Sequence, residues 1–407
     1  MKNSFLSEMR SRGYLNQCTD LDNLEKVSKE KTIKAYIGFD CTAPSLHVGS
    51  LLQIMILRLL QKYGHQPIVL LGGGTTLIGD PSGKDTTRKI LKQKDIKKNI
   101  TSIKKLFEKL LFSKSKKTKP IFVDNYQWLS KLKYIDFLRD IGKHFTLNKM
   151  LTFESVKLRL DREQSLSYTE FNYMILQAYD FYQLYKKHDC ILQMGGSDQW
   201  GNIVNGVELI RRILQKDSYG LTTPLITLSS GAKMGKTEKG AVWLDKKMFS
   251  PYDYWQFWRN IDDRDVVKFL KMFTDLSLEK IENIKSKEIN SLKILLANET
   301  TSMLHGAKAD RQAEKTAKNT FGNKRACLTE KLFDLNKEKG RAPFDIEIVS
   351  VDPGKKDWPY HVHATGWELY IAVEGKAQMR IDDSFVEMAE GDSIQCAPGV
   401  AHQLSLI

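Results

Sequence analysis

Two short tracts of this chain carry residue types that suit the handling of a nucleoside triphosphate. The first covers residues 46–50 and contains His47 and Gly49, and the second covers residues 233–237 and contains Lys233 and Lys236. Lysines on a loop with glycines can close over a triphosphate and neutralise the charge that develops when it is cleaved. Taken alone, the second tract is also typical of an exposed polar loop.

Glycines at 72–74 and 79–83 offer backbone N–H groups that phosphates could approach closely. Their spacing differs from that of a P-loop, because three residues instead of four separate Gly79 from Gly83. Asp85 also follows Lys84, where a P-loop requires Ser or Thr. The usual P-loop NTPase is therefore disfavoured, and close packing is the alternative use of these glycines.

The elements that must position these tracts alternate between buried strands and helices. Strands are predicted at 33–39, 67–71 and 191–194, and helices at 46–60 and 171–185. This alternation predicts an α/β fold with a parallel sheet, whose ligands bind beyond the carboxyl ends of the strands. Asp40, His47 and Asp80 are expected at such strand exits.

Downstream of residue 265 the apolar pattern is helical as far as residue 320, and beyond residue 344 it becomes strand-like. Strands are predicted at 345–351, 368–373, 377–381 and 393–396. The predicted domains are an α/β domain at 1–220, a lysine loop with a helical domain at 221–325, a linker at 326–343 and a small β segment at 344–407.

The charge and the cysteine content limit which classes of protein this chain can belong to. The formal net charge of the 407 residues is +14, and residues 84–119 hold 14 basic and 3 acidic side chains. This basic run is either the solvent-exposed side of an amphipathic helix or a surface that attracts RNA. The five cysteines are scattered, which argues against a disulfide framework and favours the cytoplasm. Neither a signal peptide nor a membrane span is expected.

Five segments, taken together, resemble the bacterial tyrosyl-tRNA synthetases, which are class I aminoacyl-tRNA synthetases. They occur in the order and at the spacing of that family, over residues 1–325. The segments are 36–49, 77–84, 173–180, 193–200 and 233–237. The resemblance implies a Rossmann-like parallel-sheet catalytic domain, followed by an α-helical domain on the anticodon side.

The resemblance also implies a tyrosine–tRNA ligase that works in two steps. Tyrosine and ATP form tyrosyl-adenylate, and the tyrosyl group then moves to the 3′ end of tyrosine tRNA. The implied catalytic residues are Thr42, His47, Lys84, Arg88, Lys233 and Lys236. The implied tyrosine-binding residues are Tyr36, Asp80, Tyr173, Gln177, Asp180, Gln193 and Gln199. The implied ATP-binding residues are Gly38, Asp40, His47, Gly49, Ser50, Gly196, Asp198, Lys233, Lys236 and Thr237.

By the same resemblance, the partners are ATP with Mg²⁺, L-tyrosine, tyrosine tRNA and a second copy of the chain, held through a segment around 125–165. Two departures from the family stand out. Ser50 occupies a position where the first signature usually has histidine, and a serine reaches less far as a hydrogen-bond donor. The small RNA-binding domain that usually ends the bacterial relatives leaves no recognisable trace.

In place of that domain, the β segment holds two spaced motifs: His361, His363, Glu368 and Gly375, and then Gly391, Pro398, Gly399 and His402. These motifs resemble those of a cupin, which is either complete or truncated here. His361 and His363 alternate on one strand and so share a face, and with Glu368 and His402 they could hold Fe, Mn, Ni or Zn. A structural remnant without metal is the alternative. Two other functions stay open at this point: tyrosine adenylation with impaired tRNA charging, and a metal-binding cupin fusion.

Overall fold

The structure is a computed structural model with two compact units, Met1–Ala317 and Lys318–Ile407. It describes residues 4–80, 91–163, 165–229, 231, 234–237, 240–321, 368–372, 375–381, 383–396 and 401–406. The finer domain boundaries drawn from the sequence stay predictions.

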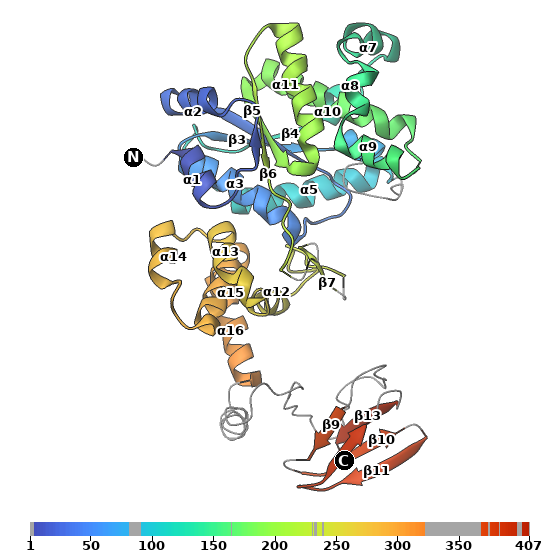
Figure 1. Ribbon diagram of the computed structural model, residues 1–407. Helices are drawn as coiled ribbons and strands as arrows, with labels where there is room; N and C mark the ends of the chain where they lie inside the picture. The colour runs from blue at the N-terminus through green and yellow to red at the C-terminus, as the bar shows by residue number, and fades with distance from the viewer. Residues whose placement is uncertain are drawn as a thin grey trace. The chain divides into compact units, whose positions relative to one another are not determined.

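The first unit is built on a six-stranded sheet in the order β1-β6-β5-β2-β3-β4 (Figure 1). The strands are β1 (Gln17–Cys18), β2 (Lys34–Phe39), β3 (Gln66–Leu71), β4 (Ile121–Asp124), β5 (Cys190–Gly196) and β6 (Tyr219–Thr223). All neighbouring pairs are parallel except β1–β6. The predicted α/β class with a Rossmann-like parallel sheet is confirmed.

Both faces of this sheet are buried, as in other parallel sheets. On β2 and β3, Ile37 and Val69 belong to the core cluster that contains helix α3 (Leu51–Lys62). Tyr36 and Ile68 point to the other face, where they join a second cluster. Successive strand residues alternate between the two faces, so Tyr36 is directed away from α3.

Helices cover both faces and form the lower part of the first unit in Figure 1. Around the sheet these are α1 (Phe5–Ser11), α2 (Leu21–Glu30), η1 (Val48–Ser50), α3, α4 (Thr75–Ile78), α5 (Gln93–Leu110), α6 (Tyr126–Leu129), α7 (Tyr134–Asp140), η2 (Gly142–His144), α8 (Leu147–Leu151), α9 (Glu154–Asp161), α10 (Tyr168–His188), η3 (Ser197–Gln199) and α11 (Trp200–Leu214). A short hairpin β7 (Lys236–Thr237) and β8 (Gly240–Ala241) precedes α12 (Pro251–Arg259), α13 (Asp263–Phe273), α14 (Leu278–Ile284), α15 (Ile289–His305) and α16 (Ala307–Phe321). Within the described residues, none of these helices is long and apolar enough to cross a bilayer.

The predicted helix at 46–60 begins later than its apolar pattern indicates. Leu46 and His47 are not helical: His47 is extended (φ −105°, ψ 169°) and forms a β-bridge with Trp243. A short 3₁₀ turn then leads into α3 at Leu51. The prediction was wrong at this end because the backbone of His47 pairs with that of Trp243, nearly two hundred residues away. The periodicity of apolar residues carries no information on such a distant partner.

Helix α10 is the longest element that carries predicted site residues, and its ends are sharply defined. Ser167 and Glu170 form a capping box, in which each side chain accepts from the other residue's backbone N–H. The helix ends at Asp189, which adopts the left-handed conformation (φ 52°). Between these caps the helix is three residues longer at each end than the predicted 171–185, and it carries Tyr173, Gln177 and Asp180.

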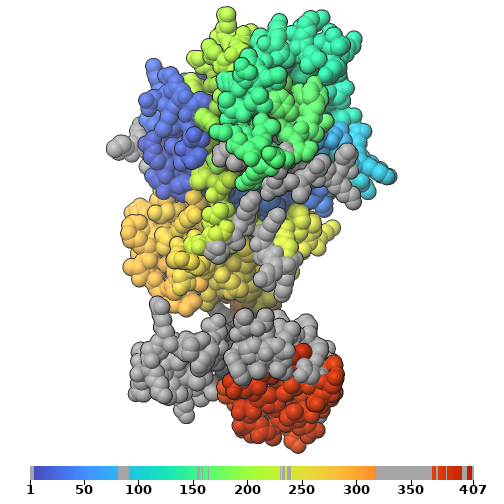
Figure 2. Space-filling view, turned by 45° about the vertical axis from the view of Figure 1, so that its right-hand side comes forward, coloured from blue at the N-terminus to red at the C-terminus, as the bar shows by residue number. Residues whose placement is uncertain are grey.

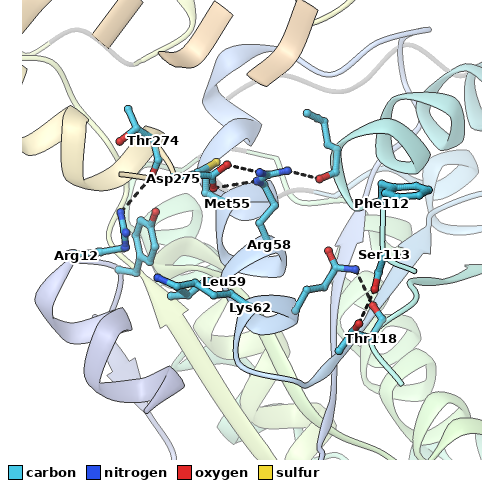
Figure 3. Close-up of a pocket in the computed structure, with 13 residues that line it drawn as sticks. Arg12, Met55, Arg58, Leu59, Lys62, Phe112, Ser113, Thr118, Thr274 and Asp275 are labelled. Carbon is cyan, nitrogen blue, oxygen red and sulfur yellow. Dashed lines mark hydrogen bonds and ion pairs between the residues drawn. The ribbon is translucent and has the colours of Figure 1, made fainter. Parts of the chain in front are cut away.

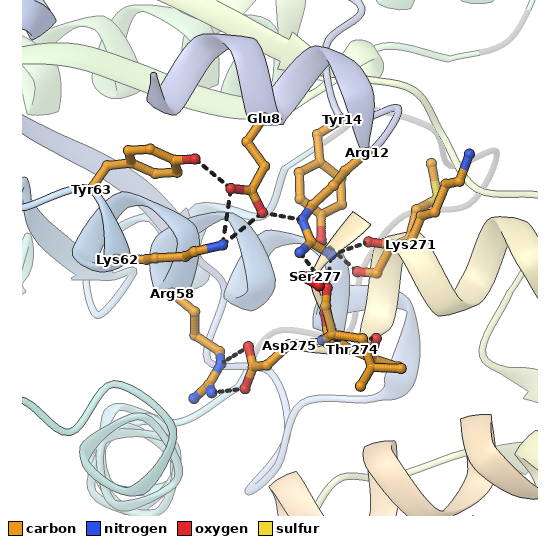
Figure 4. A network of polar contacts seen from close by, with 12 residues as sticks. Glu8, Arg12, Tyr14, Arg58, Lys62, Tyr63, Lys271, Thr274, Asp275 and Ser277 are labelled. Carbon is orange, nitrogen blue, oxygen red and sulfur yellow. Dashed lines mark hydrogen bonds and ion pairs between the residues drawn. The ribbon is translucent and has the colours of Figure 1, made fainter. Parts of the chain in front are cut away.

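A buried polar network joins the sheet domain to the helices that follow (Figure 4). The Arg12 guanidinium donates to the Lys271 carbonyl at 2.7 Å and to the Leu276 carbonyl at 2.7 Å, at the end of α13. Glu8 accepts from Arg12 and from Lys62. Burial alone would raise the pKa of Glu8, but hydrogen bonds from Tyr63, Lys62 and Arg12 hold that pKa below its ordinary value. The network therefore stabilises the junction with Glu8 ionised.

From residue 368 onward, the strands of the second unit's described part all pair antiparallel. They are β9 (Glu368–Ile371), β10 (Ala377–Ile381), β11 (Ser384–Met388), β12 (Ser393–Cys396) and β13 (His402–Leu406). Strand β10 lies between β11 and β13, and β9 pairs with β12. The small core contains Ala377, Met379 and Met388. The predicted β-rich tail is confirmed, although β11 and β13 were not predicted and the strand expected at 345–351 lies outside the described residues.

Candidate active site

The predicted site residues gather where the order of the parallel sheet reverses. Along the chain, β2, β3 and β4 follow one another to one side, whereas β5 and β6 lie on the other side of β2. Asp40 directly follows β2, and Gly196 ends β5. Ligands of open parallel sheets bind in the crevice that such a reversal leaves at the carboxyl edge.

Asp180 is the most deeply buried acid of this site, with 1% of its surface exposed. One of its oxygens accepts from Asn125 Nδ2 at 2.8 Å, and the other accepts from Trp128 Nε1 at 2.7 Å. Burial raises the pKa of Asp180 to about 7, and these two hydrogen bonds act against that rise. At neutral pH a large fraction of this carboxyl group is therefore ionised and can accept a further hydrogen bond.

Tyr36 and Gln193 lie side by side on the sheet face that α10 covers. They are register partners on the parallel strands β2 and β5, and Tyr36 packs against Phe181 of α10 with ring centroids 5.4 Å apart. Among the described residues, Tyr36 Oη and Gln193 Oε1 are buried without a hydrogen-bond partner. Burial and the nearby charge of Asp180 both raise the pKa of Tyr36. Because unpaired buried polar atoms are costly, these atoms point to a polar ligand.

A second chain of polar contacts connects three residues predicted to bind tyrosine. Gln199 Nε2 donates to Asp80 Oδ2 at 2.9 Å. Asn202 Nδ2 donates to Gln199 Oε1 and to Gln177 Oε1, both at 3.1 Å. Tyr173 is buried on the same helix as Gln177, one turn earlier. The structure thus brings Asp80, Gln177 and Gln199 together, and it does so through Asn202.

The two signature tracts touch each other. The N–H of Gly49 donates to His47 Nδ1 at 3.0 Å, and a Cβ on Gly235 would lie 2.9 Å from the Gly49 nitrogen and 3.0 Å from His47 Nδ1. Backbone hydrogen bonds from Val48 to the Val242 carbonyl at 2.8 Å and from Val242 to the Gly235 carbonyl at 3.1 Å join the same segments. The lysine tract is therefore anchored directly on the histidine tract.

The turn after β2 is held in place from two sides. The N–H of Cys41 donates to Thr76 Oγ1 at 2.9 Å, and the Cys41 carbonyl accepts from Asn99 Nδ2 at 2.8 Å. The flanking residues Asp40 and Thr42 are half-buried and exposed, respectively. This arrangement leaves Thr42 open to a ligand at the carboxyl edge of the sheet.

Four residues predicted to contact ATP lie in or next to β2, α3 and β5. Gly38 lies in β2, and Ser50 is half-buried at the start of α3, where its side chain makes no capping hydrogen bond. A Cβ on Gly196 would lie 2.5 Å from Asp198 Oδ1, so glycine lets this carboxylate fold against the end of β5. The structure brings Gly196 and Asp198 together, and it leaves their predicted ribose contact a prediction.

The glycine run at 72–74 serves close packing. A Cβ on Gly73 would lie 2.1 Å from Asp124 Oδ1, and the N–H of Gly74 donates to Asn125 Oδ1 at 2.7 Å. These contacts press the end of β3 against the end of β4. Because the same Asn125 binds Asp180, the packing of the glycines helps to position the acid.

Several predicted residues fall outside the described part of the chain. Lys84, Arg88 and Lys233 lie there entirely, as do the side chains of Lys236 and Thr237, whose backbone forms β7. Their assigned roles stay predictions.

The predicted metal ligands of the tail are described only in part. His361, His363 and the side chain of Glu368 lie outside the described residues. His402 opens β13, has 1% of its surface exposed and packs edge-on against Tyr370 at 5.6 Å between ring centroids. In the described part of the chain, no three His, Cys, Asp or Glu side chains form a group that could hold a metal.

Reasoning from the sequence missed three site residues: Asn125, Trp128 and Asn202. Asn125 directly follows the carboxyl end of β4, which is a position where polar residues often face a ligand. Asn202 lies three residues after Gln199, a spacing that places two side chains on one side of a helix. Nothing in the local sequence distinguishes Trp128 from an ordinary core residue.

Comparison with known proteins agrees with these features. A family profile described as tRNA synthetases class I (W and Y) matches residues 28–322, which is more than half of the chain. A cupin domain profile matches residues 347–406. The tyrosine–tRNA ligase of Pelagibacter ubique (strain HTCC1062) is 69% identical over 319 residues, which cover 78% of this chain and 78% of that protein. The tyrosine–tRNA ligase of Wolbachia pipientis subsp. Culex pipiens (strain wPip) is 56% identical over 331 residues, which cover 80% and 79%.

A solved structure extends the agreement to the fold. The C-terminally truncated mitochondrial tyrosyl-tRNA synthetase of Aspergillus nidulans superposes with a TM-score of 0.71 at 30% identity, covering 79% of this chain and 95% of that one. The synthetase profile ends at residue 322, before the cupin profile begins at residue 347. The chain belongs to the class I tRNA synthetase family for tryptophan and tyrosine, and within it to the tyrosine–tRNA ligases.

Proposed function

We propose that this tyrosine–tRNA ligase forms tyrosyl-adenylate in the crevice at the ends of β2, β3 and β5 and transfers the tyrosyl group to tRNA in the same place. In the first step a tyrosine carboxylate oxygen attacks the α-phosphorus of ATP, and the bond to pyrophosphate breaks. In the second step a ribose hydroxyl at the 3′ end of the tRNA attacks the tyrosyl carbonyl, and AMP leaves.

One observation supports tyrosine as the amino-acid substrate. Asp180 accepts two hydrogen bonds and retains lone pairs, while Tyr36 Oη and Gln193 Oε1 are buried without partners among the described residues. A phenol hydroxyl both donates and accepts, so it suits a carboxylate and a tyrosine hydroxyl together. A phenylalanine ring would leave those groups unpaired, which is the form of discrimination that this type of site achieves best.

The remaining residues supply binding and charge neutralisation, because neither step needs a covalent bond to the protein. We assign the ammonium group of tyrosine to Asp80, Tyr173 and Gln177, with Gln199 beside them, and we place Gln193 nearby, next to Tyr36. Gly196 and Asp198 are assigned to the ribose, and Gly38, Asp40, Gly49 and Ser50 to the adenylate. Thr42 and His47 are assigned to the γ-phosphate, and Lys84, Arg88, Lys233, Lys236 and Thr237 to the pyrophosphate.

The contact between Gly235 and the His47 tract supports this division of roles. A lysine tract anchored beside His47 can bring its positive charge to the phosphates that His47 contacts. Mg²⁺ bound with ATP would add further neutralisation of the phosphate charge.

A tyrosine-dependent exchange of labelled pyrophosphate into ATP tests the first step, and charging of tyrosine tRNA by the same preparation tests the second. We expect both activities in the full chain. Exchange without charging would support the alternative of an adenylating enzyme that transfers poorly. Absence of tyrosine-dependent exchange would contradict the proposed chemistry.

We infer a homodimer from the segment around 125–165. Large apolar side chains are exposed on α7, α8 and the start of α10, where a typical monomer keeps such patches small. Their exposed fractions are 60% for Tyr134, 71% for Ile135, 65% for Leu147 and 64% for Tyr168. Figure 2 presents this part of the first unit, in teal and green, as a broad face at its upper end.

Charge placed on this face should separate the copies. We expect the double variant Ile135→Glu/Leu147→Glu to sediment at about half the mass of the wild type, because buried unpaired carboxylates oppose association. Phe112→Glu is the matched control, since Phe112 is 73% exposed elsewhere on the first unit. An unchanged mass for the double variant would place the interface elsewhere.

For the tail we propose a metal bound by the His361, His363 and His402 imidazoles and the Glu368 carboxylate. The donor set of three nitrogens and one oxygen suits Fe, Mn, Ni or Zn. The deep burial of His402 supports an inward-facing ligand as well as a purely structural role.

A cytoplasmic location is proposed from the scattered cysteines.

A further inference from the structure

A strongly basic surface lies on α5 and the loop that follows it. Between residues 92 and 119 every lysine is exposed, and the segment has only two acidic residues, Asp95 and Glu108. The lysines are Lys92, Lys94, Lys97, Lys98, Lys104, Lys105, Lys109, Lys114, Lys116, Lys117 and Lys119. None of the roles assigned above uses this surface.

The amphipathic pattern of α5 fixes which way the lysines point. Ile96, Ile103 and Phe107 are buried in the main core of the first unit, so the opposite side of the helix faces solvent. Lys94, Lys98 and Lys105 are spaced by four and seven residues and therefore form one stripe along that side. An amphipathic helix explains the buried side, but it does not require so one-sided a charge.

The ends of α5 place the stripe between the crevice and the helical part of the unit. Asn99, in its first half, donates to the Cys41 carbonyl next to Asp40 at the carboxyl edge of the sheet. Lys109, near its end, donates to the Leu304 carbonyl at the end of α15. Because α5 connects β3 to β4 in a parallel sheet, it runs back from the carboxyl edge. The lysines thus lead away from the edge at which the tRNA 3′ end must react.

The stripe carries unbalanced repulsion. Lys94 with Lys98 and Lys105 with Lys109 are like-charge pairs four residues apart, and each such pair destabilises a helix by a few tenths of a kcal/mol. The ion pair between Lys104 and Glu108, at 3.9 Å, offsets little of this. A bound polyanion would relieve the repulsion, so the surface gains most from a partner with closely spaced negative charges.

An exposed aromatic ring lies beside these lysines. Phe112 is 73% exposed at the rim of a pocket of about 380 Å³. Arg58, Ser113 and Thr118 also line this pocket, and Figure 3 draws Phe112 next to Ser113 at its edge. Aromatic rings among lysines are typical of surfaces that bind unpaired nucleotides, because every base can stack on a ring. An anionic membrane fits less well, since the apolar side of α5 is already buried.

We propose that the α5 lysine stripe, with Phe112 at its end, is a docking surface for the tRNA outside the crevice. The lysines contact backbone phosphates and Phe112 stacks on an unpaired base. Lysine lacks the planar fork of arginine, so this surface adds attraction and orientation without reading sequence. The inference rests on the ligase activity, because that activity makes an RNA the natural polyanion for this face.

The test compares two triple variants of the full chain with equal loss of charge. Lys94→Gln/Lys98→Gln/Lys105→Gln removes the stripe, and Lys26→Gln/Lys29→Gln/Lys31→Gln removes three exposed lysines at α2. We expect the first to raise the KM for tRNA about tenfold and to reduce the salt slope of tRNA binding by about two to three, because each phosphate contact adds about 0.7 to 0.9. Phe112→Ser should weaken tRNA binding without changing the salt slope.

The outcomes separate the inference from the ligase activity itself. Pyrophosphate exchange needs no tRNA and should stay within about twofold of wild type in both triple variants, so its loss would concern adenylate formation. Equal tRNA KM values and equal salt slopes for the two triple variants would overturn the docking surface. If the Lys94/Lys98/Lys105 variant lost binding to anionic phospholipid vesicles but bound tRNA as the wild type does, the tRNA docking surface would be overturned in favour of a membrane-binding surface.

Discussion

Asp180→Asn should raise the KM for tyrosine about a hundredfold while the KM for ATP changes by less than about threefold. Asparagine has the shape of aspartate but only one acceptor oxygen. In the wild type, Asn125 and Trp128 each donate to one carboxylate oxygen. The new NH₂ group would meet one of these donors, and the negative charge that attracts the phenol hydroxyl would be gone. Steady-state kinetics with each substrate varied in turn measures the split.

The pH dependence gives this prediction a second measurement. Burial raises the pKa of Asp180 to about 7 in the free site. The phenol hydroxyl donates to the ionised carboxylate, so tyrosine binding should weaken as the pH falls below about 7, where the carboxyl group must first lose its proton. Trp128→Phe removes one donor and should move this dependence to higher pH. Asp180→Asn should abolish it.

The contribution of Asp180 to folding stability should change with pH in the direction opposite to tyrosine binding. An acid whose pKa is raised in the folded state binds more protons there than in the unfolded chain, so its contribution to stability falls as the pH rises from about 4 to 7. The melting temperature of Asp180→Asn relative to wild type should therefore increase over that range. A fixed difference at all pH values, together with equal losses for tyrosine and ATP, would contradict the assignment of Asp180 to the phenol.

Gly235→Ala should lower the rate of adenylate formation about a hundredfold or more, with little change in the KM for tyrosine. The added methyl group would lie 2.9 Å from the Gly49 nitrogen and 3.0 Å from His47 Nδ1, which is too close for backbone to accommodate without movement. A displacement of about 1 Å can cost about a hundredfold in a reaction that depends on alignment. Single-turnover formation of tyrosyl-adenylate measures the rate directly.

Gly231, which precedes the lysine tract by two residues, offers a matched control. Both glycines have positive φ, +94° for Gly235 and +81° for Gly231, so alanine carries a similar backbone penalty at either position. A Cβ on Gly231 would meet no heavy atom within 4 Å. Gly231→Ala should therefore retain most of the rate. Similar losses in the two variants would show that backbone strain, not the contact between the tracts, explains the result.

Local patterns in the sequence predicted much of the scaffold. Apolar runs located β2, β3 and β5 to within two residues at each end, because strands buried on both faces are continuously apolar. One reading of the basic run was an amphipathic helix, and α5 is such a helix, with Ile96, Ile103 and Phe107 buried along one side. The start of α3 was predicted wrongly, since His47 pairs with Trp243 instead of joining the helix.

The types of residue that bind tyrosine and ATP were readable from the chain, because phosphates, a phenol and an ammonium group each restrict which side chains can serve. Their partners were not readable. Asn125 and Trp128 reach Asp180 across more than fifty residues of sequence, and Gly235 reaches Gly49 across almost two hundred. Such contacts depend on how β3, β4 and α10 pack, and packing involves distances that neither periodicity nor spacing along the chain encodes. Tertiary structure alone therefore reveals which groups donate hydrogen bonds to the Asp180 carboxylate and which glycine joins the two signature tracts.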